Sequence, residues 1–264
     1  MPCEPLYRSH TLDLVSCIGN AAHRDPYPME WPRFEVHFQD DGGYLIGDEG
    51  RTLVVDPNHV EIRRAGASAM YSRPAVAVDR GTSVRLPPGL AFRLVPGTHP
   101  ASGCLVRPLP GRLFEEWRSI RRTFGAGVHR AAAGSIEDRT IAMLGAILRM
   151  EPAEPRLSPR QRALVERVKQ ELLVHVASPI RLPDVAKLVG YSPHHLGRIF
   201  FGATGWTIHR YLTELRLRLA AARIEAGAEN FSSLALGLGF SSHSHFTTTF
   251  RARFGCPPAR FREL

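Results

Sequence analysis

The chain has 264 residues, of which 44% are hydrophobic and 22% charged, as is typical of a folded chain of one or two domains. Its net charge of +9 is unevenly spread: residues 158–264 carry 15 Lys and Arg against 7 Asp and Glu, whereas residues 1–157 carry 19 against 18. No stretch reaches the roughly 18 apolar residues of a membrane span, and residues 1–7 lack an apolar signal sequence, which excludes the membrane-protein class.

The cysteines indicate a compartment. Cys3, Cys17, Cys104 and Cys256 are widely scattered, and neither a C-x-x-C pair nor a zinc-ligand spacing links them. Such usage is typical of a reducing compartment. The sequence therefore predicts a cytoplasmic protein without a zinc site.

Residues 7–105 are predicted to form β structure. Residues 34–38 alternate between apolar and polar types, residues 44–46 do so in part, and Gly42-Gly43 between them suits a hairpin turn. Further short apolar runs, separated by turn signals, lie at 51–55, 59–62, 75–78 and 82–86. Many short strands with frequent turns predict a small barrel or sandwich.

Histidines in this β half raise the alternative of a metal-dependent enzyme. They are His23, His37, His59 and His99, and they include no H-x-H pair and no spacing for a facial triad. Neither a nucleophile-elbow motif nor a G-x-G-x-x-G loop is present. The sequence therefore predicts no catalytic residue, no metal ligand and no cofactor.

Two helices are predicted after the strands. Residues 111–124 place Leu113, Trp117 and Ile120 on one face, and glycines at 125 and 127 follow. Residues 135–150 begin with Ser135, which we expect to cap a helix, and the apolar positions of that helix are Ile136, Ile141, Leu144, Ile147 and Leu148. This second helix packs either on the barrel or against another copy of the chain, and the sequence leaves both open.

A proline-rich segment follows at residues 151–160, which contain Pro152, Pro155 and Pro159. Prolines among charged residues are typical of a stiff linker between domains. Residues 161–176 then return to helical periodicity, with an inward face formed by Leu164, Val168, Leu172 and Val176. We therefore expect a domain boundary at this linker.

The last eighty or so residues contain an internal repeat. Ala186 and Gly190 recur 49 positions later, as Ala235 and Gly239. Three further residues recur 50 positions later; the pairs are Leu196 with Phe246, Phe200 with Phe250, and Gly205 with Gly255. A repeat at this period indicates two copies of one supersecondary unit.

Each copy is predicted to be two helices joined by a tight turn. In the first copy, we expect Asp184 to cap a helix that Gly190 ends, and Ser192 to cap the next helix, with Pro193 at its first position. In the second copy, Gly239 ends the first helix and Ser241 is the expected cap of the next. This is the helix-turn-helix layout, whose second helix enters the major groove of DNA.

A long helix is predicted between the copies. Residues 208–226 contain neither glycine nor proline, and their apolar positions recur near helical spacing. Such a helix spans roughly 28 Å at 1.5 Å per residue. Two units set this far apart can reach successive major grooves, which lie about 34 Å apart on one face of the duplex.

Residues 181–262 resemble the DNA-binding domain of the AraC/XylS family of transcription regulators. The residues that carry the resemblance are Ala186, Gly190-Tyr191-Ser192, Leu196, Phe200, Thr204-Gly205, Tyr211, Leu215-Arg216, Gly239-Phe240, His245-Phe246, Phe250, Phe254-Gly255 and Pro257-Pro258. The resemblance implies a sequence-specific DNA-binding transcriptional regulator. Its implied partners are double-stranded DNA and RNA polymerase.

The β half is similar, more weakly, to the cupin-like sensor half of some AraC-type regulators, through Asp56-Pro57-Asn58-His59-Val60, Ser72-Arg73-Pro74 and Asp79-Arg80. This resemblance implies an α+β chain of two domains. Residues 1–150 would then form a cupin-like domain with appended helices that binds a small-molecule effector and forms a homodimer. Residues 151–160 would be the linker, and residues 161–264 an all-α bundle with two helix-turn-helix units.

A second class of function stays open from the residues alone. It is a cupin-type metal-dependent enzyme, or a small-molecule-binding protein, with a helical appendage. Affinity for duplex DNA that falls as salt rises would distinguish the regulator from this alternative, because each neutralised phosphate releases counterions.

Outward residues on the second helix of the first copy are expected to read bases; they are His194, His195 and Arg198. Arg198 is the leading candidate because a guanidinium can bind guanine O6 and N7 together. Gly197 lies beside it and contributes no side chain. The family usually carries basic residues directly after the position of Phe200. In this chain Phe201 and Gly202 stand in their place, which removes phosphate contacts.

In the second copy, the expected base-reading residues are His243, Ser244, Thr247 and Thr248. Thr248 stands where many relatives carry arginine, so this helix is expected to discriminate less. Residues expected to contact the DNA backbone, which positions rather than specifies, are Ser192, Arg210, Ser241, Arg251 and Arg253.

Overall fold

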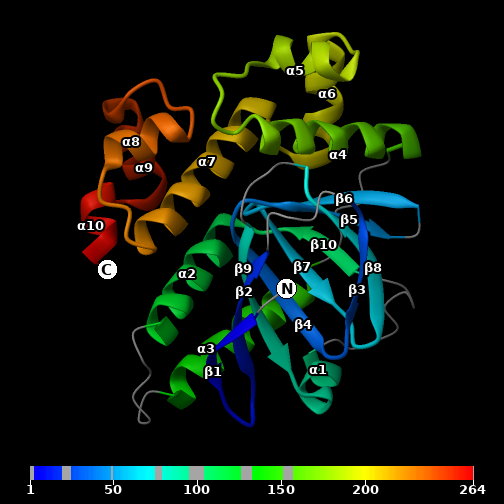
Figure 1. Cartoon of the computed structure of the whole chain (residues 1–264), viewed down its shortest axis with the longest axis vertical. Helices are drawn as coiled ribbons and strands as arrows, with labels where there is room; N and C mark the ends of the chain where they lie inside the picture. The colour runs from blue at the N-terminus through cyan, green and yellow to red at the C-terminus, as the bar shows by residue number, and fades with distance from the viewer. Residues whose placement is uncertain are drawn as a thin grey trace. The chain divides into compact units, whose positions relative to one another are not determined.

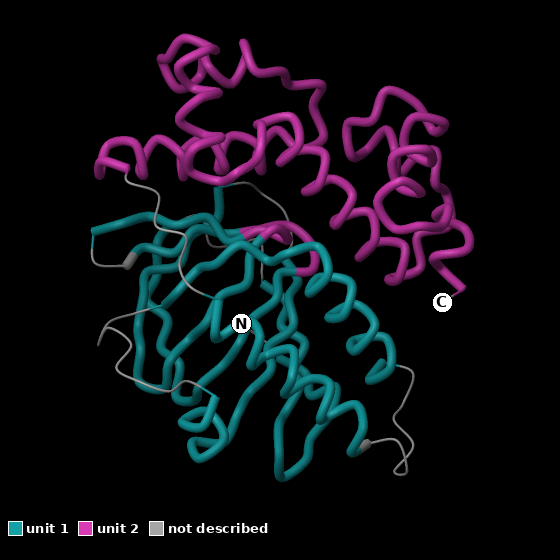
Figure 2. Tube along the Cα trace, turned by 180° about the vertical axis from the view of Figure 1, so that it is seen from behind, with its two compact units in different colours: residues 1–39, 44–55, 59–153 teal, residues 40–43, 56–58, 154–264 magenta. Residues whose placement is uncertain are grey.

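A computed structural model describes most of the chain, which forms two compact units (Figure 2). Unit 1 comprises residues 1–39, 44–55 and 59–153, and unit 2 comprises residues 154–264 with the two short turns 40–43 and 56–58. The described residues are 3–19, 25–48, 50–74, 79–94, 104–125, 133–150 and 157–263. The predicted two-domain α+β fold is confirmed.

Two sheets form the β part of unit 1 (Figure 1). The larger sheet has the strand order β1 (Cys3–Arg8), β2 (Asp13–Gly19), β9 (Asp79–Leu86), β4 (Phe34–Asp41), β7 (His59–Arg63) and β10 (Cys104–Pro108). The smaller sheet has the order β3 (Tyr27–Trp31), β8 (Ala67–Ser72), β5 (Tyr44–Asp48) and β6 (Arg51–Val55). Neighbouring pairs such as β2 with β9 and β5 with β8 run antiparallel.

Most of the predicted strands are confirmed, but one connection is not a hairpin. The alternating runs at 34–38 and 44–46 form β4 and β5, and Gly42 between them has a φ of 70°. However, β4 pairs with β9 and β7 in the larger sheet, whereas β5 pairs with β8 and β6 in the smaller one. The glycine turn therefore carries the chain from one sheet to the other. The run expected at 75–78 lies outside the described residues.

The larger sheet packs one face against helices. Phe38 on β4 stacks on Trp117 of α2 (Gly111–Gly125), with ring centroids 4.0 Å apart. The next helix, α3 (Ala133–Leu148), buries Ile136, Leu144 and Ile147. It begins two residues before Ser135, so Ser135 lies inside the helix and the expected cap is wrong. The inward face of α3 packs within its own chain.

Aromatic side chains of the smaller sheet meet charged side chains of the larger sheet between the two sheets. The smaller sheet contributes the buried rings of Trp31, Tyr44 and Tyr71. The larger sheet contributes Glu61 and Arg63, whose guanidinium Nη2 donates to Glu61 Oε2 at 2.8 Å and to the Tyr44 hydroxyl at 2.9 Å. These charges alternate with apolar residues because successive side chains of a strand point to opposite faces.

Two cysteines of unit 1 are joined although their spacing gave no sign of it. Cys3 and Cys17 are register partners on the antiparallel pair β1–β2 and form a disulfide. Cys104 and Cys256 are buried and lie outside this disulfide. A disulfide is at odds with the reducing compartment expected from the sequence. The sequence did not reveal this pair, because Cys3 and Cys17 become neighbours only through the register of β1 and β2.

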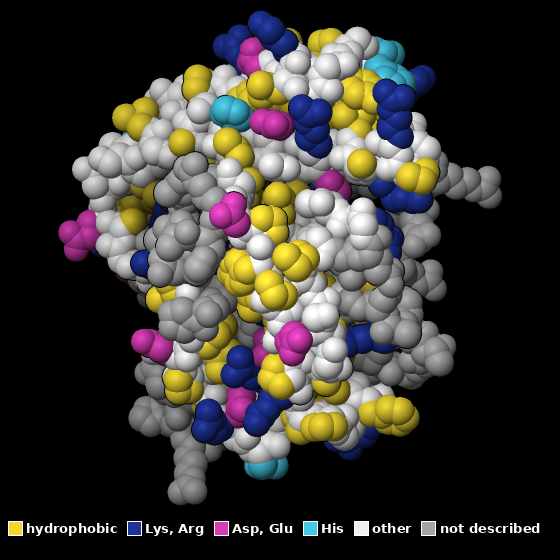
Figure 3. All heavy atoms as spheres, turned by 45° about the vertical axis from the view of Figure 1, so that its right-hand side comes forward, with side chains coloured by type: hydrophobic (Ala, Val, Ile, Leu, Met, Phe, Trp, Pro, Cys, Tyr) yellow, Lys and Arg dark blue, Asp and Glu magenta, His cyan; other side chains and the backbone are white. Residues whose placement is uncertain are grey.

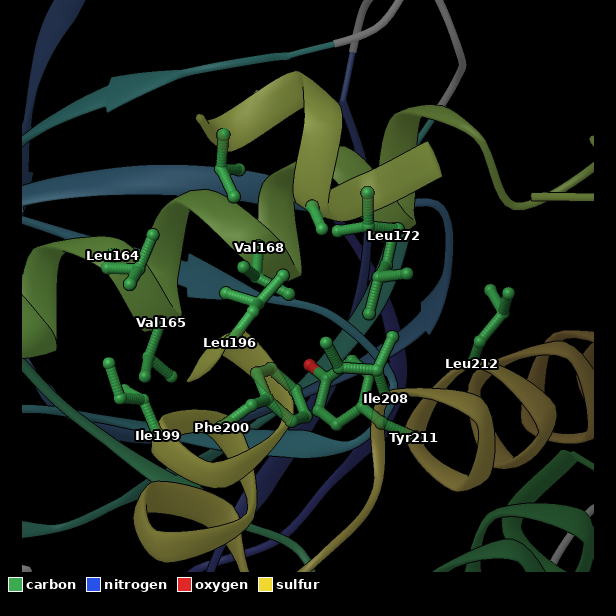
Figure 4. Packing of buried hydrophobic residues seen from close by; sticks show 13 residues of the cluster. Leu164, Val165, Val168, Leu172, Leu196, Ile199, Phe200, Ile208, Tyr211 and Leu212 are labelled. Carbon is green, nitrogen blue, oxygen red and sulfur yellow. The ribbon is translucent and has the colours of Figure 1, made fainter. Parts of the chain in front are cut away.

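Unit 2 is built from helices, and the first four of them share one apolar cluster. Its helices are α4 (Pro159–Val174), α5 (Leu182–Val189), α6 (Pro193–Thr204), α7 (Ile208–Glu225), α8 (Phe231–Gly237), α9 (His243–Phe254) and α10 (Pro258–Glu263). Figure 4 shows side chains of α4, α6 and α7 pointing into this cluster, among them Val168, Phe200 and Tyr211. The remaining helix of the described chain, α1 (Pro88–Leu94), belongs to unit 1.

Three helix starts of unit 2 differ from the predictions. α4 begins at Pro159 because Ser158 caps it with a capping box, so the predicted linker ends earlier than residue 160. Asp184 is the third residue of α5, where its carboxylate accepts from the Arg181 backbone N–H, and it is not the cap. In the second copy the cap is Ser242 instead of Ser241. Residues 151–156 of the predicted linker lie outside the described residues.

Candidate nucleic-acid interface

The first helix-turn-helix consists of α5, a turn and α6. Gly190 takes the left-handed conformation (φ 76°) that ends α5, and its backbone N–H returns to carbonyls of that helix. Ser192 accepts the His195 backbone N–H and begins α6, with Pro193 at the first position. Leu196, Ile199 and Phe200 are buried, which fixes the opposite side of α6 as the exposed one.

The second helix-turn-helix repeats this construction with α8 and α9. Gly239 (φ 75°) makes the turn, Ser242 caps α9, and Gly255 (φ 76°) ends it. Phe246 and Phe250 are buried at the positions that match Leu196 and Phe200. Both second helices are 12 residues long, so the two copies present equivalent exposed faces. Figure 1 shows them near opposite ends of α7.

Equivalent positions on these faces carry different chemistry. Arg198 and Thr248 are a repeat pair, both exposed and both in the middle of their helix. His194 and Ser244 are a second exposed pair, one turn earlier. The structure therefore places His194 and Arg198 on one exposed face of α6 and their repeat partners on the matching face of α9, and the long cationic donor of the set is on α6 alone.

The two histidines that precede the buried Leu196 and Phe246 pack on their turns. The His195 ring stacks on Tyr191, with centroids 5.9 Å apart and planes 14° apart. Its repeat partner His245 meets Phe240 edge-on at 5.5 Å, and its Nδ1 lies 3.0 Å from the Ser241 hydroxyl. Among the predicted base-reading residues, His195 therefore has a packing role as well as partial exposure, and Thr247 is likewise half-buried with its hydroxyl 3.4 Å from His243 Nε2.

The predicted backbone contacts differ in how available they are. Arg251 and Ser192 are exposed, and Arg210 is exposed with its guanidinium 5.2 Å from the centre of the Trp206 ring. Arg253, in contrast, is half-buried and donates from Nε to both carboxylate oxygens of Glu214, at 2.8 and 2.9 Å. Its charge is shared with that carboxylate, which makes it the weakest of the predicted phosphate contacts.

Two polar residues of α7, whose structural roles the sequence did not predict, hold the copies in place. Glu214 accepts from Arg218 Nε on its own helix and from Arg253 on α9. Arg216 donates to the carbonyls of Val176 and Ser178, just after α4, at 2.9 and 2.6 Å. Glu214 thus links α7 to α9, and Arg216 links α7 to the segment that follows α4. Helical periodicity alone could not reveal them, because each is a polar residue on a helix with charged neighbours.

Basic and aromatic side chains are exposed on α6. Figure 3 shows Lys, Arg and His side chains over part of unit 2, interspersed with acidic and apolar ones. Phe201 in the second half of α6 is 56% exposed. The surface chemistry of α6 is therefore arginine, histidine and an exposed ring, which suits base edges and the thymine methyl group.

The structure also bears on the metal and membrane alternatives. Within the described ranges, no group of three His, Cys, Asp or Glu side chains could hold a metal ion. His37 is fully buried between Ser83 and Gln39, and burial, with the nearby Arg63, lowers its pKa well below the ordinary value. His23 and His99 lie outside the described residues. Of the described helices, none is both long and apolar enough to span a bilayer.

The glycine turns give a prediction with a matched control. A Cβ on Gly239 would lie 2.5 Å from Arg216 Nη2 and 3.0 Å from the Ala177 carbonyl oxygen, whereas a Cβ on Gly190 meets nothing within 4 Å. Both glycines have positive φ, so either alanine costs about 1–2 kcal/mol in backbone strain. Gly239→Ala should cost more, because Arg216 cannot move without losing its two carbonyl partners. Thermal unfolding of both variants checks this, and equal losses would contradict it.

Comparison with known proteins supports the reading of unit 2. A family profile described as a helix-turn-helix domain matches residues 185–264. The "Probable transcription factor PqrA" of Proteus vulgaris is 38% identical over 84 residues, which cover 32% of this chain and 69% of that protein. The "Regulatory protein SoxS" of Escherichia coli K12 is 31% identical over 101 residues, which cover 37% of this chain and 94% of that one.

The chain belongs to the AraC-type family of transcription regulators. Other relatives match over a smaller share of their length: the "Right origin-binding protein" of Escherichia coli K12 is 35% identical over 88 residues, 33% of this chain and 30% of that protein. Among solved structures, the C-terminal domain of AraT from Geobacillus stearothermophilus is 27% identical over 41% of this chain and 87% of that chain, with a TM-score of 0.38. The resemblance predicted for residues 181–262 is confirmed.

Proposed function

We propose that this AraC-type regulator binds duplex DNA through α6 and α9, and that unit 1 binds a small-molecule effector that changes this binding. The observation that carries the DNA half is the repeated construction: two exposed helix faces, each fixed by a capped start and a left-handed glycine, on either side of one long helix. The 18 residues of α7 span about 27 Å at 1.5 Å per residue, close to the spacing of successive major grooves.

The division of labour between the helices follows from their exposed residues. Arg198 can donate two parallel hydrogen bonds to a guanine, and His194 lies one turn away on the same face. On α9, Thr248 offers a single hydroxyl and a methyl group. We therefore expect α6 to specify a half-site that contains guanine, and α9 to bind a neighbouring half-site with less discrimination. Arg251, Arg210, Ser192 and Ser241 contribute backbone contacts.

The remaining parts of the function are proposals of the same kind. RNA polymerase and a second copy of the chain are the expected protein partners. A transcription regulator of this kind catalyses no reaction, so we propose no enzymatic activity. We expect a DNA-binding regulator to act in the cytoplasm. The Cys3–Cys17 disulfide would then have to persist in a reducing compartment. Alkylation of the purified protein before and after reduction would report the state of that pair.

Binding-site selection on the full chain tests the proposal. Arg198→Ala should weaken binding to the preferred site by about 1–3 kcal/mol and relax the preference at one or two base pairs. Thr248→Ala, at the matched repeat position, should cost less, since a neutral hydroxyl bond contributes about 0.5–1.5 kcal/mol. Arg251→Ala should weaken all sequences alike and lower the salt slope by about one unit.

The controls separate base reading from charge. Arg80 is an exposed arginine of unit 1, so Arg80→Gln should leave the selected sequence and the affinity unchanged. If Arg198→Ala lowers affinity equally for all sequences, Arg198 binds phosphate and the sequence is read elsewhere or through DNA shape. Wild-type protein without measurable duplex affinity at low salt would overturn the proposal as a whole.

A further inference from the structure

The two helices expected to read DNA bases, α6 and α9, differ at the position directly after the buried Phe200 and Phe250. At this position α6 carries Phe201, and α9 carries its repeat partner Arg251. The Phe201 side chain is 56% exposed, and Arg251 is exposed as well. Equivalent places in the two copies therefore present an apolar ring and a cation. The cation suits phosphate, whereas the ring has no donor for a phosphate and needs another explanation.

The place of Phe201 on α6 matters more than its exposure, because single exposed apolar residues are common on protein surfaces. At 3.6 residues per turn, His194, Arg198 and Phe201 lie within about 60° of one another around the helix axis. Leu196 and Phe200 point the opposite way, into the apolar cluster of unit 2 (Figure 4). Phe201 therefore belongs to the face of α6 that is expected to enter the major groove, beside Arg198.

Glycines border this face on both sides. Gly197 lies about 40° beyond Phe201 around the axis, and Gly202 lies about 40° beyond Arg198. Both are inside α6, where glycine is less favourable than alanine. Packing within the chain does not require them, because a Cβ on Gly197 would meet Leu182 Cδ2 at an ordinary 3.9 Å and a Cβ on Gly202 meets nothing within 4 Å.

The second copy shows that side chains fit at both places. Thr247 and Ala252 of α9 are the repeat partners of Gly197 and Gly202. The construction of the helix therefore gives no reason for the glycines of α6. A glycine lets a partner approach the helix backbone closely. With both flanks bare, α6 can lie deep in the groove, and the ring of Phe201 can reach the base edges.

Thymine is the base whose edge in the major groove carries an apolar group, its C5-methyl. A phenyl ring packed against this methyl group removes apolar surface of both partners from water, which is favourable. Cytosine, adenine and guanine present only hydrogen-bond donors and acceptors there. The exposed ring on the groove-facing side of α6 is thus suited to one base in particular.

We propose that Phe201 is a specificity-determining residue of α6 that contacts a thymine methyl group, and that Gly197 and Gly202 allow the close approach that this contact needs. Phe201 lies about 4.5 Å along the helix axis from Arg198, at 1.5 Å per residue. The spacing of bases along one strand is about 3.4 Å. The thymine should therefore lie within about two base pairs of the guanine that Arg198 binds. The inference rests on the proposed function, because it adds a base-reading residue to the same helix.

Replacement of thymidine by deoxyuridine tests this contact on the full chain, since the two pair alike and differ only in the methyl group. The probe is the duplex that binding-site selection returns for the wild type, with each thymine of the α6 half-site replaced in turn. At one position the wild-type affinity should fall about fourfold, the size expected for one buried methyl group. Phe201→Ala should bind the thymine duplex about four- to tenfold more weakly and should not distinguish thymine from uracil at that position.

Further variants separate the apolar contact from charge and from helix stability. Phe201→Leu should keep part of the thymine preference. Phe201→Arg, which copies the residue of α9, should lose that preference and steepen the salt dependence by about one unit. Arg198→Ala should keep the thymine preference while it relaxes the preference for guanine. Gly197→Gln with Gly202→Gln should fold at least as stably, because glutamine is the better helix former, yet no longer distinguish thymine from uracil.

Phe92→Ala is the matched control, because Phe92 is an 83% exposed phenylalanine of unit 1 and lies outside α6 and α9. It should bind both duplexes as the wild type does. Thermal unfolding of each variant establishes that it folds, and more than half of the Phe201 side chain is exposed, so its replacement removes little packing.

The outcomes distinguish this inference from the function on which it rests. Wild-type protein that binds no duplex overturns both. If the wild type binds with a guanine preference that depends on Arg198, but uracil costs nothing at any position, only the thymine contact is wrong. The same holds if the selected α6 half-site contains no thymine, or if Phe201→Ala weakens the thymine and uracil duplexes equally.

Discussion

Arg63→Met should lower the free energy of unfolding of unit 1 by about 3–5 kcal/mol, because it leaves the buried Glu61 carboxylate without its cation. Arg63 Nη2 lies 2.8 Å from Glu61 and Nη1 lies 3.5 Å from Glu35, and all three side chains are at most 3% exposed. The guanidinium also lies 5.2 Å from the centre of the Trp31 ring. A methionine fills much of the volume but restores none of the charge.

Hydrogen exchange on the full chain measures this loss where it occurs. Peptides that cover β4 and β7 should exchange faster in Arg63→Met, while peptides from α4 to α9 keep their protection. The double variant Arg63→Met with Glu61→Gln should recover part of the loss, since the amide leaves no buried charge at position 61. A single variant as stable as the wild type would show that water already reaches this network.

The strands of unit 1 were predictable where alternation was strong, and the pairing of those strands was not. Residues 34–38 and 59–62 alternate, and both became strands of the larger sheet. Gly42-Gly43 predicts a turn, but a turn signal does not say whether the next strand pairs with the previous one or crosses to another sheet. The Cys3–Cys17 pair is hidden for the same reason: it depends on a cross-strand register that sequence spacing does not encode.

The two helices expected to read DNA bases, α6 and α9, were predictable because the sequence signals that define them are local. A left-handed glycine, a cap residue and an apolar face within 12 residues define α6, and the repeat at 49–50 positions supports each of them in α9. The cap of α9 is Ser242 instead of the predicted Ser241. Local signals do not fix the first residue of a helix here, since either serine can accept a backbone N–H. A cavity of unit 1 that residues 9–13, 32–34, 64–65 and 85–88 line could not be foreseen, because these four segments lie far apart in the sequence.

A shared carboxylate in α7 gives the second large effect. Burial disfavours the ionised form of Glu214, yet the guanidiniums of Arg218 and Arg253 outweigh it and lower its pKa below the ordinary carboxyl value. A depressed folded pKa means that this stabilisation is complete above the unfolded pKa and is lost as the pH falls through the folded one. Unit 2 should therefore lose stability in acid below the ordinary carboxyl range, and Glu214→Gln should lose that part of the pH dependence.

Glu214→Ala should destabilise unit 2 by about 3–5 kcal/mol, because Arg218, whose side chain is wholly buried, loses its carboxylate. The same substitution releases Arg253, the contact that ties α9 to α7. Binding to the full operator should then fall more than the loss of stability explains, since α9 is no longer held at a fixed distance from α6, whereas binding to the α6 half-site alone should change little in the folded fraction. Glu229→Gln, which neutralises an exposed carboxylate just after α7, is the matched control and should alter neither quantity. Equal losses on the full operator and on the half-site would mean that the Glu214 contacts stabilise unit 2 without positioning its second reading helix.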